Sequence, residues 1–351
     1  MNKFWSEIAN SIEPYTAGEQ PKDKKYIKLN TNENPYSPSV KVLDAIRNAA
    51  NESLKLYPDP TCNDLKTAIA EYYRLDNEQI FIGNGSDEIL AFSFMAFFNP
   101  KEKVLFPDIT YSFYPVFSDL FNIDYKCVPL DDEFNVQTKL LNEENGGIII
   151  SNPNAPTGIS LPVSSIEEIL KNNTDSVVII DEAYIDFGGE SAYKLINKYE
   201  NLLVVQTFSK SRSLAGLRVG FAMGNSNLIN ALVKIKNSFN SYTTGKLALI
   251  GAIEAIKDND YFEMTTKKII KTREIVVKKL KEMGFWVLDS KANFIFISHP
   301  KVNAEKLFIE LRSRGILVRY FSKKRIDNFI RISMGEIEDM ERFIYEINDI
   351  I

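Results

Sequence analysis

Three short runs of apolar residues, each followed closely by polar side chains, constrain the fold of this chain more than any other feature. They lie at Ile148–Ile150, Val177–Ile180 and Leu202–Val205, and segments with helical spacing accompany them. Uniformly apolar strands that alternate with helices are typical of a mostly parallel sheet covered on both faces. In such a sheet, polar residues beyond the carboxyl ends of the strands line the binding crevice. The sequence therefore predicts an α/β fold with its functional site at that edge.

The third run leads into Thr207–Gly220, a stretch with several hydroxyls, one lysine and, eight positions after that lysine, an arginine. An amine such as that of Lys210 loses its proton more easily near other positive charge or when partly desolvated, and it can then attack a carbonyl. Thr207, Ser209 and Arg218 suit a phosphate ester beside it. Together these residues favour a Schiff base with a phosphorylated aldehyde, which describes pyridoxal phosphate.

The other two runs place further polar side chains at the same edge. Ile148–Ile150 leads into a loop that contains Asn154, and Val177–Ile180 is followed by Asp181 and Tyr184. An acid directly after four β-branched residues is costly to bury unless it is paired. We therefore expect Asp181 to have a partner in the crevice.

A glycine turn between a strand and a helix offers a place for an anion. Gln79–Ile82 has the pattern of a strand, Gly83–Glu88 follows it, and a long apolar helix comes next. Glycines let backbone N–H groups approach an anion, and the helix dipole favours negative charge. The alternative is that Ser86 or Asp87 simply caps a helix. Tyr111 lies past another strand end, where its ring could stack on a flat ligand or pack in the core.

Composition narrows the classes of function. The chain has 351 residues and a net charge of −5, which argues against a general nucleic-acid surface. With one histidine, His299, a Ser-His-Asp site or a multi-histidine zinc site is hard to build, so no metal is expected. The chain has two cysteines, no apolar signal core and no stretch near the roughly 20 apolar residues of a membrane helix. These features favour the cytoplasm and no membrane partner.

The pattern changes after about residue 245, which suggests a division into domains. Residues 1–29 suit an N-terminal arm or a part of the small domain, 30–245 a large cofactor-binding domain, and 246–351 a small α+β domain. A long helical stretch from Leu247 to Met283 is expected to bridge the two domains. Short strands are expected at Phe285–Leu288, Asn293–Ile297, Ile316–Arg319 and Phe329–Ile332.

Arg319 and Arg331 stand out in this second part of the chain. Arg331 alternates with apolar residues in a predicted strand. An arginine in such a strand suggests a buried anion partner, often a carboxylate held by two hydrogen bonds. A snorkelling arginine on an edge strand is the alternative.

Several short motifs stand in a characteristic order along the chain. They are Asn32–Tyr36, Gly83–Glu88, Asn152–Gly158, Asp181–Tyr184, Ser209–Lys210 with Arg218, and Arg331. In this order the chain resembles the histidinol-phosphate aminotransferase family of class II, fold-type-I pyridoxal-phosphate enzymes, from about Pro14 to the C-terminus. The resemblance implies an aspartate-aminotransferase-like fold with a large, mostly parallel seven-stranded sheet domain and a smaller α+β domain.

The resemblance also implies roles around the cofactor. Lys210 would bind pyridoxal 5'-phosphate covalently and carry the proton, Asp181 would pair with the pyridine nitrogen, and Tyr184 would hydrogen-bond the ring hydroxyl. Tyr111 would stack on the ring. The residues expected around the cofactor phosphate are Gly85, Ser86, Asp87, Thr207, Ser209 and Arg218.

For the substrates, Arg331 resembles the arginine that binds the α-carboxylate of glutamate. Arg319, Tyr15 and Tyr57 match the pocket for the substrate phosphate, with Tyr57 coming from the other subunit of a homodimer, and Asn32 lines the substrate site.

One position departs from the family pattern. Many relatives have asparagine directly before the proline of the Pro-Thr-Gly motif, where it hydrogen-bonds the ring hydroxyl, but this chain has Ala155 there. Either Asn154 serves instead, or Tyr184 holds the oxygen without it.

The expected reaction transfers an amino group between glutamate/2-oxoglutarate and a small phosphorylated carbonyl compound. Histidinol phosphate/imidazole-acetol phosphate, a pair of histidine biosynthesis, comes first. Another amino-alcohol phosphate of about three carbons, or decarboxylation of serine or threonine phosphate on the same fold, stays open. A non-enzymatic effector module of a transcription regulator is disfavoured, because the arm before Asn30 is short and the chain is acidic.

Overall fold

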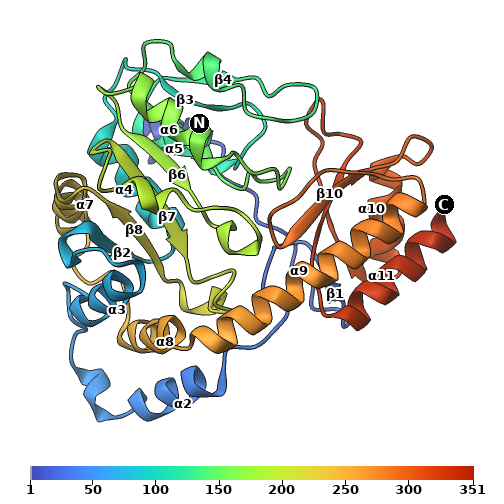
Figure 1. Ribbon diagram of the computed structural model, residues 1–351, viewed down its shortest axis with the longest axis horizontal. Helices are drawn as coiled ribbons and strands as arrows, with labels where there is room; N and C mark the ends of the chain where they lie inside the picture. The colour runs from blue at the N-terminus through green and yellow to red at the C-terminus, as the bar shows by residue number, and fades with distance from the viewer. Residues whose placement is uncertain (1) are drawn as a thin grey trace.

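The computed structural model describes residues 2–351 and contains a large sheet, a small sheet and a long helix that runs between them (Figure 1). The large sheet has seven strands in the order β2-β8-β7-β6-β5-β3-β4. Their bounds are β2 Ile80–Gly83, β3 Val104–Pro107, β4 Tyr125–Val128, β5 Gly147–Ser151, β6 Val178–Asp181, β7 Leu202–Thr207 and β8 Gly220–Gly224. Strand β8 runs antiparallel to both of its neighbours, and the other pairs are parallel. The predicted α/β fold with a mostly parallel seven-stranded sheet is confirmed.

The central strands are apolar throughout because both of their faces are covered. Consecutive side chains of a strand point to opposite faces. In β5, Ile148 and Ile150 belong to one hydrophobic cluster, whereas Ile149 belongs to another. The first cluster is covered by α2 (Val40–Ala49), α3 (Asn63–Tyr73), α6 (Val163–Asn172) and α8 (Lys246–Lys257). The second is covered by α4 (Ser86–Phe97), α5 (Phe113–Phe121) and α7 (Ser226–Phe239).

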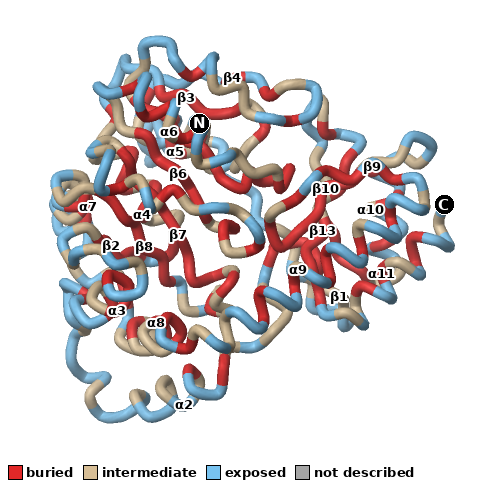
Figure 2. The backbone as a smooth tube through the Cα atoms, viewed as in Figure 1, coloured by how far each residue is buried: buried red, intermediate tan, exposed pale blue. Residues whose placement is uncertain are grey.

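The smaller sheet has four strands in the order β12-β13-β10-β9. They are β9 Trp286–Val287, β10 Phe294–Ser298, β12 Arg319–Tyr320 and β13 Ile330–Ser333. Strand β1 (Ile27–Lys28) pairs in parallel with β11 (Ile316–Leu317), so the end of the N-terminal segment lies beside this sheet. Helices α9 (Asn259–Glu282), α10 (Ala304–Ser313) and α11 (Ile337–Ile350) contribute to a third hydrophobic cluster there. Figure 2 shows the buried backbone concentrated in the two sheets, with exposed turns around them.

Two segments differ from the sequence-based expectation. The predicted helical stretch from Leu247 to Met283 is two helices, α8 and α9, that meet at Asp258. Asp258 has a ψ of 64°, and its carboxylate lies 2.9 Å from the ammonium of Lys41. The predicted strand Ile316–Arg319 is divided between two sheets, because β11 pairs with β1 whereas β12 pairs with β13.

The first helix, α1 (Glu7–Ser11), is short and has no buried residue. Between residues 2 and 351, no helix is both long enough and apolar enough to cross a membrane.

Candidate active site

A cavity lies at the carboxyl ends of β6 and β7, where the large sheet faces the small one. Most of the predicted site residues line it, and they come from segments far apart in the sequence. They are Tyr15, Asn32, Ser86, Asp87, Tyr111, Asp181, Tyr184, Thr207, Ser209, Lys210, Arg218, Arg319 and Arg331. The crevice predicted from the strand ends is therefore present.

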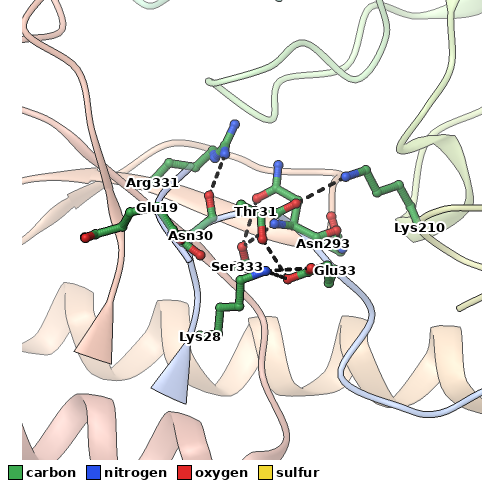
Figure 3. A network of polar contacts seen from close by, with 10 residues as sticks. Glu19, Lys28, Asn30, Thr31, Glu33, Lys210, Asn293, Arg331 and Ser333 are labelled. Atoms are coloured by element: carbon green, nitrogen blue, oxygen red, sulfur yellow. Dashed lines mark hydrogen bonds and ion pairs between the residues drawn. The ribbon is translucent and has the colours of Figure 1, made fainter. Parts of the chain in front are cut away.

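Lys210 follows β7 and points its amine into this cavity. The amine donates a hydrogen bond to the backbone carbonyl of Thr31 at 3.2 Å, as Figure 3 shows, and lies 5.5 Å from the centre of the Tyr184 ring. The amide of Asn34 donates to the carbonyl of Lys210 at 3.0 Å, and the hydroxyl of Ser211 donates to the carboxylate of Asp186 at 2.5 Å. These bonds hold the backbone at the lysine and directly after it.

Asp181 ends β6 and is 3% exposed. Its carboxylate accepts a hydrogen bond from the hydroxyl of Tyr114 at 2.9 Å and one from the backbone N–H of Ala183 at 3.3 Å. Burial raises the pKa of Asp181 to about 6, against an ordinary value of 3.8. A cation placed in the cavity would stabilise the ionised form. The carboxylate of Asp181 is therefore suited to bind a positively charged group of a ligand.

Tyr114 is a residue that the sequence reasoning did not select. It is fully buried, and burial together with the neighbouring Asp181 raises its pKa well above the usual range, so it is a hydrogen-bond donor at neutral pH. The aromatic segment around Tyr111 was the available signal, but a sequence does not tell which tyrosine of a helix start meets an acid two strands away.

A second corner of the cavity suits an anion. Helix α4 begins at Ser86, directly after Gly85, whose φ of 83° favours glycine. The guanidinium of Arg218 donates to the hydroxyl of Ser209 at 3.1 Å and lies 3.6 Å from the carboxylate of Asp87. Backbone N–H groups at a helix start, a hydroxyl and an arginine together bind phosphate well.

Glycine is required where β8 passes this corner. A Cβ atom on Gly220 would lie 2.6 Å from the backbone carbon of Gly85 and 2.6 Å from the backbone nitrogen of Ser86. Strand β8 therefore packs against the start of α4 at a distance that only a glycine at position 220 allows.

The two predicted arginines of the small sheet lie opposite each other, because Arg319 in β12 pairs with Arg331 in β13. Arg331 donates to the carbonyl of Asn30 at 3.0 Å, and its Nε is buried without a hydrogen-bond partner in the described chain. Arg319 donates to the carbonyl of Thr16 at 3.2 Å. Both guanidinium groups retain hydrogen-bonding capacity toward the cavity, which suits two anionic groups of a ligand.

Asn154 and Tyr57 do not line the cavity in this chain. The amide of Asn154 accepts from Thr110 at 2.8 Å and donates to the carbonyl of Ile109 at 2.9 Å, so the surrounding loop engages it. Its neighbour Ala155 faces the cavity. Tyr57 is 81% exposed and stacks on Tyr242 with 4.6 Å between ring centres.

Asn32 and Tyr184 meet inside the cavity: the amide nitrogen of Asn32 donates to the hydroxyl of Tyr184 at 3.1 Å. Tyr111 donates to the carboxylate of Asp87 at 2.8 Å, and Tyr15 stacks on Phe113 with 4.4 Å between ring centres. Thr207 donates to the carbonyl of Val219 at 3.3 Å.

Comparison with known proteins shows the family to which the chain belongs. Residues 24–347 match the family described as aminotransferase class I and II. Histidinol-phosphate aminotransferase from Clostridium beijerinckii is 58% identical over 100% of this chain and 98% of its own length, and that from Clostridium acetobutylicum is 58% identical over the whole of both. The crystal structure of histidinol-phosphate aminotransferase from Sinorhizobium meliloti with pyridoxal-5'-phosphate has a TM-score of 0.90 at 23% identity, over 100% of this chain and 99% of that one. The chain therefore belongs to the class I and II aminotransferase family.

Proposed function

We propose that this protein is a pyridoxal-phosphate-dependent aminotransferase that exchanges an amino group between glutamate/2-oxoglutarate and histidinol phosphate/imidazole-acetol phosphate. The observation that carries the proposal is one cavity that holds Lys210, the buried Asp181 and the Arg218 corner, with Arg319 and Arg331 on its opposite side. Relatives named histidinol-phosphate aminotransferase at 56–58% identity over the full chain support the choice of substrate.

The residues present fit this cofactor. Its phosphate suits the corner formed by Ser86, Ser209 and Arg218. A protonated ring nitrogen suits Asp181, because burial raises the pKa of this carboxyl to about 6 and a nearby cation would stabilise its ionised form. Tyr111 also lines the cavity. When bound, pyridoxal phosphate supplies an aldehyde for the amine and a ring that accepts electrons during the exchange.

The residues of the chain perform the remaining tasks. Lys210 carries the proton between the reacting carbons, since its amine already extends into the cavity. Asp181 keeps the ring nitrogen protonated. Arg331 binds the α-carboxylate of glutamate with two hydrogen bonds. Arg319 and Tyr15 bind the phosphate of the other substrate.

The active unit is proposed to be a homodimer, with Tyr57 completing the substrate-phosphate pocket of its partner. Tyr57 stacks on Tyr242, and the segments that carry these two tyrosines expose further apolar side chains. These are Leu54, Leu56 and Phe239. Burying such side chains stabilises an association. Light scattering at several concentrations measures the state, and a monomer with full activity would refute it.

We also propose the predicted division into 30–245 and 246–351, because the cofactor corner and the arginines would then belong to different domains. The two cysteines, Cys62 and Cys127, are free, which fits the reducing cytoplasm as the proposed location.

The proposed exchange is tested with the purified protein and its cofactor. Glutamate should bleach the visible absorbance of the bound cofactor, and imidazole-acetol phosphate should restore it. If glutamate does not bleach the absorbance, the proposed aminotransferase activity is refuted. Carbon dioxide released from threonine phosphate without a keto acid would assign a decarboxylase instead.

A further inference from the structure

The hydroxyl of Tyr184 is held from one side only. The tyrosine is buried, packs edge-on against Phe294 with 5.0 Å between ring centres, and lines the cavity beside Lys210. Its oxygen accepts the amide N–H of Asn32 at 3.1 Å, and no acceptor for its own proton is recorded within residues 2–351. A phenol has one proton to donate. That proton is therefore available to a ligand in the cavity.

The orientation of the Asn32 amide follows from its other bonds. The backbone N–H of Asn32 donates to the hydroxyl oxygen of Ser333 at 2.8 Å, and this hydroxyl donates its own proton to Oδ1 of Asn32 at 2.9 Å. With Oδ1 engaged as an acceptor, the NH2 group faces Tyr184. The carbonyl of Asn32 accepts from Asn293 at 3.0 Å, and Figure 3 shows Ser333 and Asn293 beside the Thr31 loop.

The backbone of Asn32 is fixed as well. Its φ is 56°, in the left-handed region that asparagine tolerates better than most residues, and the side chain is 1% exposed. The amide cannot turn without breaking two buried hydrogen bonds, one with Ser333 and one with Tyr184, which is costly. The donor that reaches Tyr184 is therefore set by the fold.

Ala155, which also lines the cavity, presents only a methyl group, and the neighbouring amide of Asn154 is engaged by its own loop. Neither side chain is free to donate a hydrogen bond to a ligand in the cavity, whereas the hydroxyl of Tyr184 is.

We propose that Asn32, held by Ser333, is a positioning residue that commits the proton of Tyr184 to the ring oxygen of the cofactor, in place of the donor that Ala155 cannot supply. The inference rests on the proposed function. A hydrogen bond to that oxygen favours its anionic form and would draw negative charge away from Nζ of Lys210, the nitrogen that bonds the cofactor. The pKa of that nitrogen is therefore lower with the bond than without it.

The test is a pH titration of the visible absorbance of the holoenzyme without substrate. Asn32→Asp keeps the shape, the bond from Ser333 and the tolerance of a positive φ, but it turns the donor facing Tyr184 into an acceptor that takes the phenol proton. Losing a charge-assisted hydrogen bond should raise the pKa of the chromophore by about one unit, a tenfold change in proton affinity.

A double-variant cycle separates this relay from the added charge of the aspartate. If Asn32 acts through the phenol, Asn32→Asp in the Tyr184→Phe background adds little beyond Tyr184→Phe alone. An equal rise in both backgrounds, or no rise in either, would overturn the inference.

Two further variants keep the result decisive if the aspartate protein binds the cofactor poorly. Ser333→Ala frees the amide to turn and should raise the pKa of the chromophore, by less than Asn32→Asp does. Ala155→Asn adds a donor and should lower the pKa of the chromophore, also in the Asn32→Asp background. The proposal is contradicted if the pKa of the chromophore stays unchanged in both variants. The titration needs bound cofactor but no turnover, so a failed exchange with imidazole-acetol phosphate would refute the proposed substrate and leave this result standing.

Discussion

The hydroxyl of Tyr114 lies 2.9 Å from the carboxylate of Asp181, and both side chains are buried, with Asp181 lining the cavity. One comes from α5 and the other from the end of β6, so the contact joins two layers of the large sheet region. It keeps a carboxylate partly stabilised where burial raises its pKa. A cation in the cavity would stabilise the ionised carboxylate of Asp181 further.

Removing this hydroxyl tests its contribution. Tyr114→Phe keeps the packing and removes one hydrogen bond to a charged group, a contribution of about 1.5–3 kcal/mol, so cofactor affinity should fall roughly 10-fold or more. Fluorescence titration of the apoprotein measures it. Tyr125→Phe is the matched control, because Tyr125 is partly exposed and lies on the edge strand β4. Equal affinities of the two variants would show that the contact has no such role.

The pH dependence of stability should report Asp181. Its pKa in the folded apoprotein is raised to about 6 from 3.8, so the folded chain holds the proton more tightly than the unfolded chain. The free energy of unfolding therefore falls, relative to Asp181→Asn, as pH rises through that window, by up to about 3 kcal/mol. Denaturant unfolding of both apoproteins at a series of pH values measures the difference. If the free energy of unfolding of the two apoproteins changes with pH in parallel, Asp181 is not a buried carboxyl with a raised pKa.

The approach of β8 to the start of α4 makes glycine necessary at one position. Gly220→Ala would bring a methyl group within 2.6 Å of backbone atoms, so the helix start must move. We expect a loss of about 1–3 kcal/mol in stability and weaker binding of cofactor phosphate. Gly216→Ala is the control, since nothing lies within 4 Å of its added Cβ. Thermal unfolding and cofactor titration report both effects, and a Gly220 variant as stable as its control would contradict the steric argument.

The two arginines should separate the two substrates. Lysine keeps the charge but loses the planar fork of donors. Arg331→Lys should slow the half-reaction with glutamate roughly 10- to 100-fold, and Arg319→Lys should raise the KM for the phosphorylated substrate by a similar factor while sparing glutamate. Single-turnover kinetics with each substrate measure this. Equal losses for both substrates in both variants would refute the assignment.

The sequence predicted the large sheet well because its strands are apolar on both faces, a pattern that few other structures produce. It also predicted that Asp181, Tyr184 and Lys210 would meet, since parallel strands end at one edge. Strand β8 was not predicted: its Gly-Phe-Ala-Met-Gly composition has little β-branched content, and it is formed by pairing with β2 and β7.

Other features depend on tertiary contacts that no local pattern encodes. The break between α8 and α9 lies at an aspartate that pairs with Lys41, more than 200 residues earlier. The bond between Asn32 and Tyr184 joins two motifs that were recognised separately, but their contact depends on Ser333 and the small sheet. For the cofactor oxygen the sequence left a choice between Asn154 and Tyr184, and the bond from the amide of Asn154 to the carbonyl of Ile109 is a tertiary contact that the sequence did not indicate.

Borohydride reduction of the holoenzyme tests most directly the proposed covalent bond between the cofactor and Lys210. Digestion and mass spectrometry should find the reduced pyridoxyl group on the peptide that contains Lys210, with none in the Lys210→Ala protein. A reduced group on a different lysine, or no adduct at all in protein that retains its cofactor, would contradict the account.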